Sequence, residues 1–177
     1  MHEINIEPGR PEAGEFLHYF EPYIAKAEGD LILPQLEKQM DRVRSVLNPL
    51  STEQVNTLHE PYTWTIKQVI GHCVDSERVF GYRAGCFAAG DQTSLPGFDQ
   101  DDFVRQTDYD PVCMTALIEK LDSLRQSNLA MFRRQNSETW MRKGMGDGKV
   151  MTVRAAAFIL VGHVNHHLQI IEKRIAG

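Results

Sequence analysis

The fold is best predicted from the stretch Gly162-His163-Val164-Asn165-His166-His167-Leu168-Gln169-Ile170-Ile171. His163 and His167 are four positions apart, so on a helix their side chains lie on one face, one turn above the other. This spacing lets two imidazoles bind one metal ion. A metal site needs a further ligand from another part of the chain, and the best candidate is His72, in Val69-Ile70-Gly71-His72-Cys73-Val74.

Apolar residues recur at helical spacing around this stretch, which predicts a helix over residues 153–175 with Thr152 as its N-cap. On a helical wheel His167 lies near the middle of the apolar face, and His163 lies about 40° to one side. Helix bundles bind metals through inward-facing side chains on neighbouring helices. The alternative is that one or both residues are core histidines that hydrogen-bond to the backbone. Three histidines would leave one coordination position open, as in catalytic metal sites.

The same periodicity predicts three further long helices, over residues 31–47, 66–89 and 111–135. Each has a start signal: Asp30 for the first, a capping box of Thr65 and Gln68 for the second, and Asp110 followed by a proline for the third. Four long amphipathic helices in one chain predict an all-α fold, a four-helix bundle.

Shorter elements are predicted between the long helices. We expect one short helix within residues 15–27, a second after the capping box of Ser51 and Gln54, and a hairpin over residues 141–151 with its turn at Asp147-Gly148. Residues 92–109 form a long loop of the kind that walls a pocket. The predicted division is an N-terminal extension over 1–29 and a bundle domain over 30–177.

Composition excludes several classes of function. The 177 residues carry a net charge of −5 and a sequence pI near 5.8, which argues against a nucleic-acid partner. No run of apolar residues is long enough to span a membrane. The N-terminus lacks the basic and apolar regions of a signal peptide, and the three cysteines form no CxxC pair. We therefore expect a cytoplasmic protein with reduced thiols.

Two motifs of metal enzymes are absent. Val164 follows His163, so the general-base glutamate of an H-E-x-x-H motif is missing, and no pair of Glu-x-x-His motifs indicates a di-iron site. Glu77 lies within the apolar stripe of its helix, where a carboxylate must be paired or belong to a functional pocket. Two interpretations are open: an ion pair with a core arginine, or a catalytic role beside the metal.

The sequence also resembles a known family. Trp64-Thr65-Ile66-Lys67-Gln68-Val69-Ile70-Gly71-His72, continuing to Asp75 and Glu77, is similar to the second-helix signature of the DinB-like (DinB/YfiT) superfamily. Gly162-His163 with His166-His167 is similar to its last-helix signature, and the stretches 78–83 and 95–99 also resemble its members. The resemblance covers roughly residues 30–175. It implies an up-down-down-up bundle and a divalent metal held by His72, His163 and His167.

The resemblance further implies a function. Some relatives transfer low-molecular-weight thiols such as bacillithiol to electrophiles, so our first expectation is a YfiT-like thiol S-transferase with a small-molecule substrate. Arg83 is then a candidate anion contact for the thiol cofactor. The alternatives are a metal-dependent hydrolase and a non-catalytic metal-binding stress-response protein. The metal expected is Zn or Ni, with Fe, Co or Mn as alternatives, and bundles of this size often form homodimers.

Overall fold

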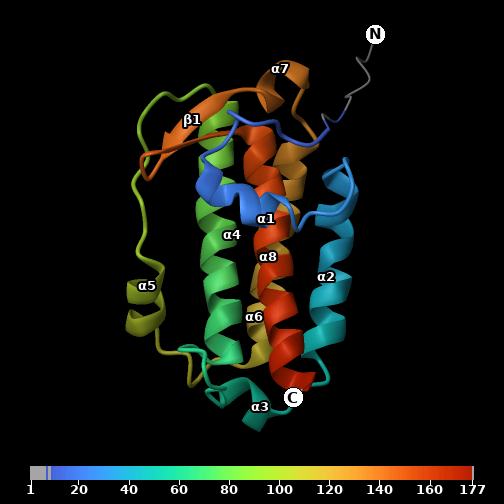
Figure 1. Cartoon of the computed structure of the whole chain (residues 1–177), viewed down its shortest axis with the longest axis vertical. Helices are drawn as coiled ribbons and strands as arrows, with labels where there is room; N and C mark the ends of the chain where they lie inside the picture. Colours follow the sequence, from blue (N-terminus) through green and yellow to red (C-terminus); the bar gives the residue numbers. More distant parts are fainter. Residues whose placement is uncertain (1–6, 8, 177) are drawn as a thin grey trace.

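Four long helices form the body of the protein, as drawn in the computed structural model (Figure 1). The structure describes residue 7 and residues 9–176. Each long helix packs against two others: α4 and α2 both contact α6 and α8. The four helices are α2 (Leu33–Leu47), α4 (Ile66–Ala88), α6 (Met114–Phe132) and α8 (Val153–Ala176). The predicted all-α four-helix bundle is confirmed.

The direction of the helices gives the bundle its topology. In Figure 1 α2 and α8 run one way and α4 and α6 run the other, which is the up-down-down-up arrangement. Because α4 and α6 are parallel, the chain must return along the length of the bundle between them. This connection carries α5 (Gln100–Gln106), a helix that the sequence analysis missed. Its start signal was present, since the Asp99 carboxylate accepts hydrogen bonds from the backbone of Asp101 and Asp102.

Several predicted helix starts are confirmed. Thr65 and Gln68 form the capping box that begins α4. Ser51 forms another with Gln54, although the helix that follows, α3 (Thr52–Asn56), is short. The Thr152 hydroxyl accepts a hydrogen bond from the backbone of the first turn of α8, at 3.1 Å.

The start predicted for the first long helix is wrong. Asp30 does not cap it: α2 begins at Leu33, and its N-cap, Ile32, has no capping side chain. The Glu7 carboxylate accepts the backbone N–H groups of Ile32 and Leu33 instead, the latter at 2.6 Å. A cap that comes from 26 positions earlier leaves no local sequence signal.

The start predicted for the third long helix is also wrong. Asp110 and Pro111 lie in a turn closed by the hydrogen bond from the Val112 N–H to the Tyr109 carbonyl, at 3.1 Å. The helix therefore begins later, with Cys113 as N-cap, and it ends at residue 132 rather than 135.

The N-terminal extension packs on α8. The predicted helix within 15–27 is reduced to η1 (His18–Phe20) and α1 (Glu21–Ile24). The extension covers polar residues of α8: Arg154 donates to the Glu15 carboxylate at 2.6 Å, and Asn165 donates to a backbone carbonyl of the extension at 2.9 Å. The division at residue 29 stays a prediction.

The hairpin lies at the end of the bundle where α8 begins. Strands β1 (Lys143–Gly146) and β2 (Lys149–Thr152) pair antiparallel. Asp147 and Gly148 both have positive φ, 56° and 66°, as the two-residue type I′ turn requires. This confirms the predicted hairpin and its turn. The Leu95 N–H donates to the Met145 carbonyl at 2.9 Å, which attaches the crossover connection to the hairpin.

A polar layer divides the apolar core at mid-height. One apolar cluster includes Phe80, Phe132 and Phe158, and the other includes Ile70, Leu121 and Leu168. Each helix contributes a buried polar side chain at the boundary; these are Gln39, Glu77, Arg125 and Asn165. Among the described residues, none of the helices has both the length and the apolar composition needed to cross a membrane.

Candidate metal centre and adjoining pocket

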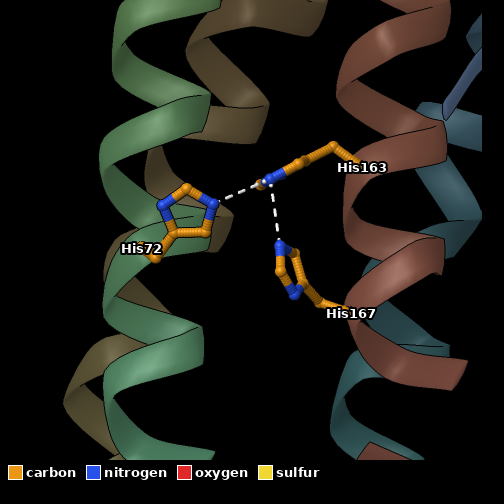
Figure 2. A group of neighbouring side chains, drawn as sticks. All are labelled: His72, His163 and His167. Carbon is orange, nitrogen blue, oxygen red and sulfur yellow. Dashed lines mark hydrogen bonds between the residues drawn. The ribbon is translucent and has the colours of Figure 1, made fainter. Parts of the chain in front are cut away.

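Helices α4 and α8 bring the three predicted histidines together. His72 lies on α4 and faces His163 and His167 on α8 (Figure 2). The Nε2 atoms of His72 and His163 are 2.9 Å apart, and those of His163 and His167 are 3.1 Å apart. One nitrogen from each of the three rings lies within 4.8 Å of the others. The i, i+4 spacing thus places two imidazoles on the face of α8 that packs against α4.

Burial keeps these imidazoles neutral. Desolvation lowers the pKa of His72 to about 4. Desolvation also lowers the pKa of His163 and of His167 well below the usual range, and the neighbouring histidines add to the effect. A neutral imidazole has a free nitrogen lone pair, which is the form that binds metals. Aromatic neighbours fix the rings, because Trp64 packs on His72 and Tyr23 packs on His163, with ring centroids 5.1 and 5.4 Å apart.

His166 lies outside this group. Its ring packs edge-on against Tyr23, with centroids 5.4 Å apart, although it neighbours His167 in sequence.

Glu77 pairs with a buried arginine and is not part of the histidine group. Arg125 donates to both carboxylate oxygens of Glu77, at 2.9 and 2.8 Å, and both side chains are fully buried. Asn128 donates to the same carboxylate at 2.9 Å, and Arg125 also donates to Gln39 at 2.7 Å. Of the two readings of Glu77, the ion pair with a core arginine is the one observed. Arg125 was not predicted as this partner, although it lies four positions from Leu121 and Leu129 on the core face of α6.

A cavity of about 120 Å³ adjoins the histidines. His72 and His163 line it, together with Arg83, which the sequence analysis singled out. The crossover connection supplies Phe98 and Gln100, so the predicted pocket wall is confirmed. The cavity is completed by residues from the extension, α4, α8 and the hairpin; these include Tyr19, Tyr23, Ser76, Asp147, Lys149 and Ile159.

None of the cysteines lines this cavity. Cys73 is buried, and desolvation raises the pKa of its thiol, which keeps it protonated. Cys113 caps α6, far along the chain from the histidines. The chain therefore offers the cavity no nucleophilic thiol of its own among the described residues.

Gly162 lets the extension approach the histidines closely. A Cβ atom at this position would lie 1.7 Å from the Tyr23 carbonyl oxygen, which belongs to the backbone and cannot rotate away. We expect Gly162→Ala to push α1 away from α8 and to destabilise the fold by about 1–3 kcal/mol, measured by denaturant unfolding. Gly85→Ala is the matched control: nothing lies within 4 Å of its Cβ, so it should be neutral or stabilising. Equal effects of the two substitutions would contradict this packing.

Comparison with known proteins places the chain in a family. It is 23% identical, over 140 residues, to a protein of Oceanobacillus iheyensis named "Putative metal-dependent hydrolase", covering 77% of this chain and 79% of the relative. Its fold is similar to that of YfiT from Bacillus subtilis, described as "a probable metal-dependent hydrolase with an unusual four-helix bundle topology". The TM-score is 0.72 at 18% identity, over 82% of this chain and 86% of that one. Residues 35–171, most of the chain, match the family model of the DinB superfamily. The chain belongs to the DinB superfamily.

Proposed function

We propose that His72, His163 and His167 bind one divalent metal ion and that the chain is a metal-dependent enzyme acting on small molecules. The observation that carries this proposal is the convergence of three imidazole nitrogens within 4.8 Å. A neutral imidazole has one lone pair and one N–H. When three of them turn toward one point, a cation satisfies their lone pairs better than hydrogen bonds among the three rings do. The two similar proteins, described as a "putative" and a "probable" metal-dependent hydrolase, support the same proposal.

The donor set fits a catalytic metal better than a structural one. Structural zinc sites have four protein ligands, whereas three protein ligands leave a position for substrate. Three imidazoles suit Zn, Ni, Fe or Co, and we propose Zn or Ni first. A metal bound here would act as a Lewis acid that lowers the pKa of a thiol or of water.

The residues around the histidines prepare a pocket for the substrate. The Tyr23 and Trp64 rings cover two of the imidazoles and exclude water from that side. Phe80 and Phe98 give the adjoining cavity an apolar wall, and Arg83 gives it a positive charge. This combination suits a small organic molecule with an anionic group.

Within this proposal, thiol transfer is our first candidate reaction. The sulfur of a low-molecular-weight thiol would form a bond to an electrophilic carbon, the leaving group would depart with its electron pair, and the thiol proton would pass to solvent. This reaction needs no general base. Such a base is hard to find here, because Arg125 and Asn128 engage the Glu77 carboxylate. The absence of a cysteine from the cavity lining is consistent with a thiol supplied as a cosubstrate.

Hydrolysis is the second candidate, and the names of the relatives favour it. One pair of assays separates the two reactions. We expect the metal-loaded protein to consume a thiol, bacillithiol included in the panel, with an electrophile such as monochlorobimane, and to lose this activity on chelation. If the protein is inert with every thiol but cleaves ester or amide substrates with the same metal dependence, it is a hydrolase. Inertness in both assays would favour a metal-binding protein without catalysis.

A further inference from the structure

One buried arginine differs from the others in its partners. Arg83, Arg125 and Arg154 are buried, with exposed fractions of 3%, 0% and 9%. Arg125 pairs with Glu77, and Arg154 pairs with Glu15. Arg83 has no carboxylate within salt-bridge distance among the described residues. Because an uncompensated buried charge is costly, the missing counter-charge calls for an explanation.

The contacts of Arg83 hold its guanidinium in one orientation. Its Nη2 donates to the Pro96 carbonyl at 2.8 Å, and its Cζ lies 5.3 Å from the centroid of the Phe80 ring. The backbone of the hairpin packs beside it, because a Cβ on Gly146 would lie 2.6 Å from the Arg83 Nε. The Pro96 bond uses one of the five N–H donors of the guanidinium. Within the described chain, no protein acceptor takes the remaining donors.

The remaining donors have access to the cavity beside the histidines. Arg83 lines this cavity together with His72 and His163. In the described part of the chain, the only buried side-chain nitrogen or oxygen without a hydrogen-bond partner is the Arg174 Nε. No Arg83 nitrogen is therefore both buried and unpaired. An unpaired Arg83 nitrogen is therefore either in contact with the cavity or open to solvent. Because Arg83 lines the cavity, its side chain is placed to meet a ligand there.

The cavity as a whole favours an anion. Lys149 adds a second positive charge to its lining, and its ammonium group bonds Asp147, the carboxylate that shares the lining. The side chains of Arg83, Lys149 and Asp147 together leave one net positive charge. Burial lowers the pKa of Arg83 by more than the charge of Asp147 raises it. Asp147 therefore does not replace a direct counter-ion.

We propose that Arg83 binds an anionic group, a carboxylate or a phosphate, of a small molecule that reaches the three histidines. The inference rests on the proposed function in one respect, which is that the reaction takes place at the histidine group. A fixed guanidinium is suited to such a group because it offers charged donors in a planar array. The substrate class that follows is a small organic acid or phosphate ester, anchored at Arg83 with its other end at the histidines.

Anion binding can be measured without knowing the reaction. The thermal midpoint of the metal-loaded protein is followed with succinate, with inorganic phosphate and with neutral succinamide, at constant ionic strength. We expect succinate or phosphate, but not succinamide, to raise the midpoint, since a ligand of the folded state stabilises it. The two anions distinguish a carboxylate site from a phosphate site. Arg83→Gln should weaken the binding by about tenfold or more, because charge-assisted hydrogen bonds are lost.

Arg78→Gln is the matched control. Arg78 lies on the same helix, its side chain is 49% exposed, and it pairs with Asp75, so its loss should leave anion binding unchanged. Arg83→Lys keeps the charge and should lose less affinity than Arg83→Gln, which gives a second test if the glutamine variant does not fold. A wild type that responds to neither anion, or an Arg83 variant that binds as the wild type does, would overturn the inference.

Metal content, measured on the same samples, separates this inference from the proposed function. A protein that binds the metal but no anion would retain the metal site and lose the Arg83 assignment. A protein that binds the anion through Arg83 but no metal would retain the anion site and lose the proposed enzyme.

Discussion

Glu77→Ala is expected to lower the free energy of unfolding by about 3–5 kcal/mol, a loss measurable by denaturant titration. The substitution removes the carboxylate that accepts two hydrogen bonds from Arg125, at 2.9 and 2.8 Å, where both side chains are fully buried. Breaking such a pair leaves an uncompensated charge in the core, and this penalty exceeds the net stabilisation that the pair provides. Asn128 loses an acceptor as well.

Two controls isolate the cause of this loss. The exposed pair Glu37–Arg133 has side chains that are 44% and 53% exposed, so Glu37→Ala should cost less than about 1 kcal/mol. The double variant Glu77→Leu with Arg125→Met removes both charges together, so it should recover much of the stability lost in Glu77→Ala. If Glu77→Ala costs no more than Glu37→Ala, the pair is not the closed core contact described above.

Chelation is expected to produce the second large effect. A metal that joins α4 to α8 binds the folded protein only, so removing it should lower the thermal midpoint of the wild type. A metal present at about a thousand times its dissociation constant stabilises the fold by about 4 kcal/mol. His72→Ala removes the ligand on α4, and this variant should show little further change on chelation. Differential scanning calorimetry with and without chelator measures both.

His166→Ala serves as the control for this experiment. His166 neighbours His167 in sequence, yet it packs against Tyr23 and lies outside the group of three. Its variant should therefore respond to chelator as the wild type does. An equal response of the wild type and His72→Ala would remove His72 from the metal site.

The parts of the fold that follow from local patterns could be predicted from the sequence. The i, i+4 spacing of His163 and His167 placed both rings on one face of α8, and the capping box of Thr65 fixed the start of α4. The Asp147-Gly148 turn was predictable because few residues other than glycine, asparagine and aspartate tolerate positive φ. Each of these features depends on residues within a few positions of one another.

The parts that depend on distant residues could not be predicted in this way. Glu7 caps α2 from 26 positions earlier in the chain. The local sequence therefore favoured Asp30 as the cap, and that prediction was wrong. Glu77 was recognised as a carboxylate in need of a partner, but its partner, Arg125, is 48 positions away on another helix. Among the described residues, Arg83 has no carboxylate within salt-bridge distance, and this could not be read from the sequence because it depends on how the chain folds.

Metal content per chain is the most direct test of the central claim, that His72, His163 and His167 hold one divalent ion. Protein purified without a polyhistidine tag is analysed for metals as the wild type and as the His163→Ala and His166→Ala variants. We expect about one ion per chain in the wild type and in His166→Ala, and a sharp loss in His163→Ala. The reason is that His163 belongs to the group of three converging imidazoles among the described residues, whereas His166 does not. Equal metal content in the two variants, or a wild type without metal after growth in metal-supplemented medium, would contradict the claim.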